Sequence, residues 1–206
     1  MIIAIDGPAA SGKGTLGRRL AAHFGLRHLD TGLIYRAVAK ALLDAGHPLD
    51  DAVRATAAAQ ALDPAQFDEK TLKGHAIGEA ASIVSAIPQV RSALVAFQRD
   101  FAKTPPGAVL DGRDIGTVIC PDADVKIFVT AAPEERARRR AADPAHASSQ
   151  SSQLSEVATA LAERDKSDST RAASPLAVAS DAVVIDTTGI SVDDVIERVL
   201  ALVERK

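Results

Sequence analysis

The sequence predicts an α/β fold in which helices cover both faces of one parallel β-sheet. Short β-rich runs alternate with longer helical patterns, and several of the runs are continuously apolar, as in strands that are buried on both faces. The length of 206 residues suffices for one well-buried core but not for two large independent domains. We therefore expect one domain, with smaller segments inserted into it.

The strands and helices of this fold can be placed from the pattern of apolar residues. The β-rich runs predict strands over residues 2–6, 27–30, 108–111, 125–130 and 182–186. Helical periodicity predicts helices over residues 13–24, 33–45, 88–101, 133–142 and 192–204. Pro88 and Pro133 suit the first turns of two of these helices, where a missing N–H group costs little.

Two stretches interrupt the alternation of strands and helices. Residues 50–88 are Ala-rich and helical without an evident strand, which predicts a helical lobe inserted between the second and third strands. Residues 143–153 are rich in Ser, Ala and Gln and show no apolar period. They predict either the tip of a mobile excursion between two helices or a plain flexible linker.

Composition narrows the class of protein. Apolar residues make up 47% and charged residues 25% of the chain, and the net charge is −3, so a soluble globular protein without a nucleic-acid partner is expected. No run approaches the about 18 apolar residues of a membrane span, and the first residues lack the pattern of a signal peptide. Cys120 stands alone, which excludes an internal disulfide framework. We expect a cytoplasmic location and, by default, a monomer.

A phosphate-binding loop follows the first predicted strand and precedes an amphipathic helix. Its residues are Gly7, Pro8, Ala9, Ala10, Ser11, Gly12, Lys13, Gly14 and Thr15. Gly7 and Gly12 let the backbone amides surround a phosphate, and Lys13 adds a point charge beside the positive end of the helix dipole. Gly14 stands where such loops usually carry a hydroxyl group that binds the metal ion. We therefore assign no residue as a definite metal ligand and name the Thr15 hydroxyl as a candidate. A plain structural turn is the alternative.

Further segments extend this pattern. They are residues 29–36 (LDTGLIYR), 111–117 (DGRDIGT), 164–171 (RDKSDSTR) and 174–176 (SPL). The GKGT ending of the loop is similar to that of nucleoside monophosphate kinases, and the segments in this order closely resemble the cytidylate kinase family over nearly the whole chain.

The resemblance implies a fold, a reaction and a division of the chain. The fold is a three-layer P-loop fold like that of adenylate kinases, with residues 1–206 as one kinase domain. Residues 31–103 form the lobe that binds the nucleoside monophosphate, and residues 134–168 form a lid. The reaction transfers the γ-phosphate of ATP to CMP or dCMP, in pyrimidine nucleotide metabolism, with Mg²⁺ bridging the phosphates.

Such a kinase must hold two polyanions together, and arginine suits this task through its permanent charge and its bidentate geometry. The expected catalytic residues are Lys13, Arg136, Arg139, Arg140 and Arg171. The expected substrate-binding residues are Thr31, Tyr35, Arg36, Ser82, Arg91, Arg113, Asp114, Arg164, Asp168 and Arg171.

The pair Arg113 and Asp114 offers a cationic donor and a carboxylate acceptor, which a pocket selective for cytosine needs. The resemblance adds Ser82 and Arg91 to the base pocket, and it places Arg164 and Asp168 on the sugar. It places Tyr35 and Arg36 on the acceptor nucleotide and Arg171 on the phosphates. Alternatives for the carboxylates are a helix cap for Asp114 and a turn for Asp168.

The arginine-rich helix expected over residues 133–142 would close over ATP. Helical spacing puts Arg136 on one face with Arg139 and Arg140, whereas Arg138 points elsewhere and pairs with Glu134. The histidines show no spacing typical of a metal site and are expected to be structural or solvated.

The sequence departs from the family pattern at one place, and it leaves two alternative functions open. Family members commonly carry a longer insertion with a small antiparallel sheet where this chain has only residues 63–81, so a reduced acceptor lobe is expected. The first rival is a P-loop kinase of another acceptor, namely UMP, AMP or shikimate. The second is a nucleotide-dependent switch, but the chain contains no Asn and so lacks a guanine-reading Asn-Lys-x-Asp segment.

Overall fold

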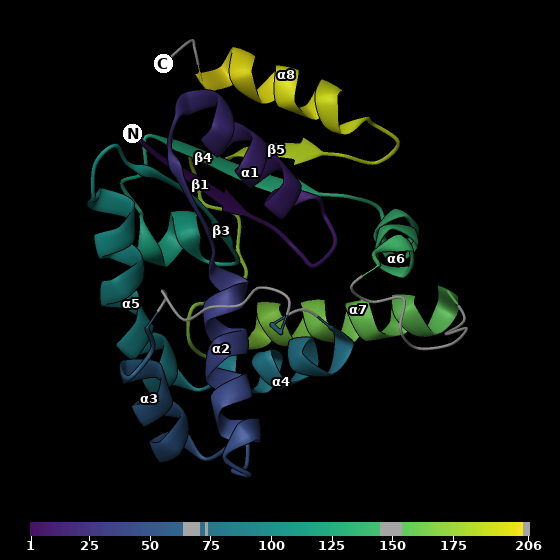
Figure 1. The fold of residues 1–206 in the computed structure, drawn as a ribbon. Helices are drawn as coiled ribbons and strands as arrows, with labels where there is room; N and C mark the ends of the chain where they lie inside the picture. Colours follow the sequence, from purple (N-terminus) through teal and green to yellow (C-terminus); the bar gives the residue numbers. More distant parts are fainter. Residues whose placement is uncertain (64–70, 73, 145–153, 204–206) are drawn as a thin grey trace.

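The computed structural model describes residues 1–63, 71–72, 74–144 and 154–203. Its sheet contains β1 (Ile2–Asp6), β2 (Arg27–Asp30), β3 (Ala108–Gly112), β4 (Val125–Thr130) and β5 (Val183–Asp186). The strand order is β2-β3-β1-β4-β5, and all neighbours are parallel (Figure 1). The predicted five-stranded parallel sheet is therefore confirmed, although β3 ends one residue later and β5 begins one residue later than expected.

Helices cover both faces of the sheet, as predicted. On one face, Ile3 and Ile5 of β1 pack with Leu20 of α1 (Lys13–Phe24) and Val199 of α8 (Val192–Val203). On the other face, Ala4 of β1 lies in a separate cluster with the end of α5 (Pro88–Lys103) and with η2 (Ile115–Ile119), a five-residue π-helix. The strand pattern did not predict η2, because five residues are too few to show helical periodicity.

Four helices form a lobe with its own apolar core, which projects from the sheet in Figure 1: α2 (Thr31–Asp44), α3 (Ala52–Gln60), α4 (His75–Ser85) and α5. No strand occurs in the parts of 50–88 that are described, as predicted, and residues 64–70 and 73 lie outside them. Helix α2 begins at Thr31 rather than at Leu33, because the Asp30 carboxylate accepts the backbone N–H of Gly32 at 2.9 Å and caps the helix.

Helices α6 (Pro133–Ala142) and α7 (Leu154–Thr170) pack against each other, and α7 runs beside α4 (Figure 1). A small apolar cluster joins them to the loop after β1 through Ala9, Ala137 and Leu161. Most of the predicted excursion, residues 145–153, lies outside the described residues. The loop after β1 therefore lies close to both α6 and α7.

No single helix in the described ranges is long and apolar enough to cross a membrane. The helical segments 76–85 and 88–103, which meet at an angle of 97°, are long and apolar enough only when they are taken together.

Candidate active site

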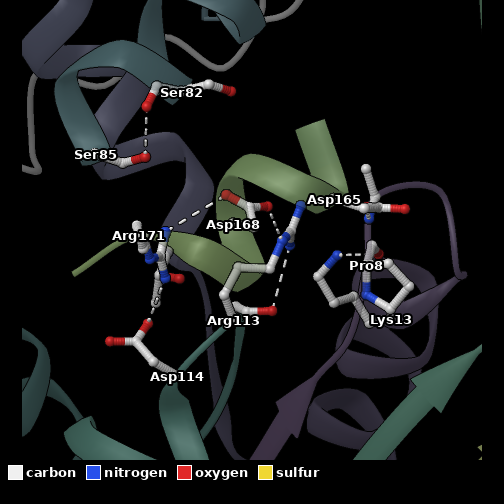
Figure 2. Close-up of polar contacts among 12 residues, drawn as sticks. Pro8, Lys13, Ser82, Ser85, Arg113, Asp114, Asp165, Asp168 and Arg171 are labelled. Carbon is white, nitrogen blue, oxygen red and sulfur yellow. Dashed lines mark hydrogen bonds and ion pairs between the residues drawn. The ribbon is translucent and has the colours of Figure 1, made fainter. Parts of the chain in front are cut away.

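The predicted phosphate-binding loop turns sharply after β1. A Cβ atom on Gly7, where φ is 154°, would lie 2.1 Å from the carbonyl oxygen of Val129, so only glycine fits there. Ala10 has a positive φ of 58°, which is unusual for a residue with a side chain. Lys13 begins α1 and donates from its ammonium group to the Pro8 carbonyl oxygen at 3.0 Å (Figure 2). The loop is thus folded back on itself around the lysine.

Lys13 is almost fully buried, and burial, followed by the charge of Arg113, lowers the pKa of its ammonium group to about 7. Nearby Asp111 and Asp30 oppose this shift. A buried cation with so low a pKa is poised to gain a proton when an anion arrives beside it.

Arg136 of α6 contacts the phosphate-binding loop directly. It donates to the carbonyl oxygens of Ala9 and Ala131, each at 3.2 Å, and to the Asp165 carboxylate at 2.5 Å. Asp165 also accepts the Ala9 backbone N–H at 3.4 Å. Side chains of α6 and α7 therefore both bind the backbone of the first half of the loop.

Arg139 lies on the other side of the loop. It donates to the Ser11 carbonyl oxygen at 3.3 Å and to the hydroxyl and carbonyl oxygens of Thr187 at 2.8 and 2.7 Å. These residues border a cavity of about 500 Å³ that also includes the exposed Thr15 and Gly12. This cavity begins at the phosphate-binding loop and is therefore the candidate site for the donor nucleotide.

The predicted partner of Arg138 was wrong. Arg138 is exposed and pairs with Glu135 at 3.0 Å, not with Glu134. Glu135 also accepts from Arg139 at 2.9 Å, so one carboxylate, three and four residues before the two arginines, serves both.

Asp114 is buried between two arginines. It accepts from Arg91 at 2.5 Å and lies 3.8 Å from Arg171 (Figure 2 draws Arg171 beside it). Arg91 also donates to the Ser85 carbonyl oxygen at 3.1 Å, and its guanidinium lies 5.3 Å from the ring centre of the buried Tyr35. Asp114 occupies the N-cap position of η2, but its side chain makes no capping hydrogen bond. The cap alternative is therefore wrong.

Asp168 joins Arg113 to Arg171. It accepts from Arg113 at 2.7 Å and from Arg171 at 3.5 Å (Figure 2). Arg171 also donates to the Ser174 carbonyl oxygen at 2.7 Å. Burial raises the pKa of Asp168, but Arg113 and Arg164 together bring it below the ordinary value, so the carboxylate stays ionised. Asp168 lies within α7, so the turn alternative is wrong.

Five cations from five segments meet near the loop: Lys13, Arg36, Arg113, Arg140 and Arg164. Burial, followed by the charges of the neighbouring arginines, lowers the pKa values of Arg140 and Arg164 to about 10 each. The buried Nε atoms of Arg36 and Arg164 have no hydrogen-bond partner among the residues described. Mutually repelling, partly unsatisfied guanidinium groups indicate a site for a polyanion.

Two predicted substrate-binding hydroxyls bond within the protein. Thr31 donates to the Asp111 carbonyl oxygen at 2.9 Å, and Ser82 donates to the Gly78 carbonyl oxygen of its own helix at 3.1 Å. Ser82 also lines a shallow depression on the outside of α4 with Ile87 and Ser167. Neither hydroxyl group is hydrogen-bonded to Asp114.

Sequence reasoning gave no role to the aspartates at the ends of β2 and β3. Asp30 and Asp111 are register partners in these strands, and both act on Lys13. Burial, and next the charge of Asp111, raises the pKa of Asp30. Asp111 is also hydrogen-bonded to His28 at 2.8 Å, so one of the histidines contacts the site. Their place at the carboxyl ends of neighbouring parallel strands, where ligands bind in such folds, was the available signal.

Asp6, at the end of β1, is a further residue that the sequence left without a role. Its carboxylate accepts the backbone N–H groups of Ile115 at 2.8 Å and Gly116 at 2.7 Å, and so caps η2. Burial raises the pKa of Asp6 from 3.8 to about 6, although both amides oppose the shift.

This pKa makes the free energy of unfolding depend on pH. The folded state binds the Asp6 proton more tightly than the unfolded state, so the contribution is complete below about pH 4 and is lost as pH rises through about 6. Between pH 5 and 7, the wild type should lose about 1 kcal/mol relative to Asp6→Asn, which does not titrate. Urea unfolding of both proteins at the two pH values measures this difference, and a constant difference contradicts the assignment.

The strand order, the phosphate-binding loop and the buried arginines around it define a P-loop kinase fold. The cytidylate kinase family model matches residues 3–205. A cytidylate kinase of Afipia carboxidovorans is 59% identical over 100% of this chain and 98% of its own length, and one of Nitrobacter winogradskyi is 59% identical over 99% and 96%. The chain belongs to the cytidylate kinase family.

These alignments also bear on the acceptor lobe. Because the aligned region covers 98% of the Afipia relative, that protein has no room for a much longer insertion. The two proteins are therefore of nearly equal length.

Solved structures support the fold alone. The crystal structure of an uncharacterized protein from Eubacterium ventriosum matches with a TM-score of 0.59 at 13% identity over 100% of this chain and 99% of that chain. The crystal structure of TT1252 from Thermus thermophilus matches with a TM-score of 0.50 at 18% identity over 100% and 96%.

Proposed function

We propose that the protein transfers the γ-phosphate of ATP to CMP or dCMP, giving ADP and CDP or dCDP. Family membership supports this reaction. The observation that carries it in the structure is the cluster of five cations, in which Lys13 of the phosphate-binding loop and four arginines act on one another's charges. Such a cluster suits two nucleotides whose phosphates must be brought together. No observation favours UMP, AMP, shikimate or a switch function.

The acceptor nucleotide is assigned to the residues around Asp114 that the lobe, the end of β3 and α7 contribute. Asp114 would accept from the cytosine amino group, with Arg91 and Arg171 holding its carboxylate in place. Arg113 and Arg164 would contact the nucleotide together with Asp168, and Arg36 would face its phosphate.

Two further predicted residues would act less directly. The ring of Tyr35 would support the guanidinium group of Arg91, and the Ser82 side chain would have to rotate away from the Gly78 carbonyl oxygen to reach the base.

The donor is assigned to the loop and its adjoining cavity. The backbone N–H groups of the loop, except at Pro8, which has none, and the Lys13 ammonium group would hold the β- and γ-phosphates. Proton uptake by Lys13 would restore the charge that burial weakens. Arg136, Arg139 and Arg140 would stabilise the transferred group. Arg136 must then exchange the Asp165 carboxylate for phosphate.

Mg²⁺ is the expected companion of ATP, and the donor groups fit it. The neighbouring carboxylates Asp30 and Asp111 and the Thr15 hydroxyl are hard oxygen ligands. Burial, followed by the charge of Asp111, raises the pKa of Asp30. No cluster of three or more His, Cys, Asp or Glu side chains that could hold a metal ion occurs within the described ranges. When bound, Mg²⁺ would neutralise phosphate charge in the transition state.

The protein's own groups account for the transfer. The oriented acceptor phosphate oxygen attacks in line, so no protein nucleophile is needed. Approach of residues 31–103 to residues 134–168 would exclude water and limit ATP hydrolysis. We further propose that the protein acts as a cytoplasmic monomer.

An acceptor screen tests this function. ADP release is measured by a coupled assay with ATP, Mg²⁺ and, in turn, CMP, dCMP, UMP, AMP, shikimate and no acceptor. We expect strong turnover with CMP and dCMP and much slower release without acceptor. Preferred turnover of another acceptor would overturn the base assignment, and equal release without acceptor would overturn the role of closure.

A further inference from the structure

Asp6 connects the strand that carries the phosphate-binding loop to the turn that carries Asp114. The Asp6 side chain is buried, with 4% of the residue exposed, and both of its carboxylate oxygens are used. One accepts from Ile115 and the other from Gly116, at 2.8 and 2.7 Å. These are the two amides that directly follow Asp114 in the chain. The carboxylate therefore fixes the backbone at the residue assigned to the cytosine amino group.

The π-helix η2, which Asp6 caps, is only weakly stabilised by its own hydrogen bonds. A π-helix of five residues has few internal hydrogen bonds, and such short π-helices are rare and frequently lie at functional sites. At its other end, Arg99 of α5 donates to the carbonyl oxygens of Val118 at 2.8 Å and Ile119 at 3.0 Å. An anion at the first amides and a cation at the last carbonyls both suit the dipole of the element. η2 is thus clamped from outside at both ends.

The fit between Asp6 and η2 is close. A Cβ atom on Gly116 would lie 3.3 Å from the nearer carboxylate oxygen of Asp6, which is tight packing. The side chain of Asp114 is fixed separately by Arg91 at 2.5 Å. Backbone and side chain of the same residue are therefore restrained by different partners, and loss of either should let the carboxylate shift.

We propose that Asp6 is a positioning residue for recognition of the acceptor base, acting through the η2 amides on Asp114. The inference rests on the proposed role of Asp114. Asp6 also directly precedes Gly7, so the competing role is support of the phosphate-binding loop. The two roles differ in the substrate whose KM they control, because the first concerns CMP and the second concerns ATP.

The test is Asp6→Asn, which keeps one acceptor oxygen but places an NH₂ group against a backbone N–H. We expect the KM for CMP to rise and the preference for CMP over UMP, as the ratio of kcat/KM values, to fall, each by about tenfold. The KM for ATP and the kcat at saturating CMP should stay within about twofold. Unchanged CMP parameters, or an equal rise in the KM for ATP, would overturn the proposal.

The matched control is Asp124→Asn, because Asp124 directly precedes β4 and its carboxylate binds the opposite end of β1. Asp124 also accepts a β1 amide, that of Ile2 at 2.6 Å, but lies at the amino end of the sheet, away from the site. The Asp124→Asn variant should leave both KM values and the base preference unchanged. If it changed the KM for CMP and the base preference as much as Asp6→Asn does, the proposal would be overturned.

If Asp6→Asn fails to fold, Arg99→Gln decides, because it loosens the other end of η2. A smaller shift of the same CMP parameters supports the proposal, and no shift overturns it. Asp114→Ala separates the two levels of inference. If this variant loses base preference and Asp6→Asn does not, only the role of Asp6 fails; if neither loses it, the base site itself is wrong.

Discussion

Lys13→Met should lower kcat by about 10²- to 10³-fold, the usual cost of removing one preorganised group that stabilises transition-state charge. Lys13 is the one buried lysine at the phosphate-binding loop among the residues described, and its ammonium group is held by the Pro8 carbonyl oxygen. The KM for CMP should change by less than about threefold, because Lys13 is assigned to the donor phosphates. Steady-state ADP release over a range of both substrates measures the two constants.

The matched control is Lys40→Met, which removes a lysine that pairs with Asp44 on the surface of α2. Such an exposed pair contributes little, so stability and kinetics should remain those of the wild type. A kcat for Lys13→Met within about threefold of the wild type would remove the lysine from the transfer step.

Much of the fold could be predicted because its signals are local. Parallel strands buried on both faces carry continuous apolar runs, and Gly7 and Lys13 stand in a spacing that fits a strand, loop and helix. Errors arose where a contact decided an element end. The cap supplied by Asp30 starts α2 two residues before the apolar period suggested, and η2 has no period at all.

The candidate site could be predicted only in part, for the same reason. The types and order of the arginines indicated a polyanion site, but their partners are set by the fold. Asp6 meets Ile115 across 109 residues, and Asp165 meets Ala9 across 156 residues. No spacing rule links such pairs, so the cap of η2 and the carboxylate beside the loop became visible only in three dimensions.

The partners of the arginines explain how the site can be ready before substrate arrives. Asp114 and Asp168 hold Arg91, Arg113 and Arg171 in fixed positions. Guanidinium groups fixed in this way lose little conformational freedom on binding, and donors set in advance stabilise charge most effectively. Buried Nε atoms of Arg36, Arg91 and Arg164 and a buried Nη2 atom of Arg171 nevertheless lack a hydrogen-bond partner within the described structure, which leaves capacity for a ligand.

Asp114→Ala should change stability and base choice together. Its carboxylate is buried against Arg91 and Arg171, and its loss leaves two buried guanidinium groups without this partner. Breaking such a buried pair costs about 3 to 5 kcal/mol of the free energy of unfolding. Loss of the assigned acceptor for the cytosine amino group should reduce discrimination between CMP and UMP by about 1 to 3 kcal/mol.

Urea unfolding and the ratio of kcat/KM values for CMP and UMP measure the two effects of Asp114→Ala. The control is Val199→Ala, which removes two methyl groups from a fully buried side chain of α8, on the opposite face of the sheet from η2, and lowers stability through a cavity. That variant should keep the wild-type base preference, so a changed preference in Asp114→Ala cannot come from lower stability alone. An unchanged CMP-to-UMP ratio in Asp114→Ala would place the cytosine contact elsewhere, because a buried carboxylate that reads the base cannot be removed without relaxing that choice.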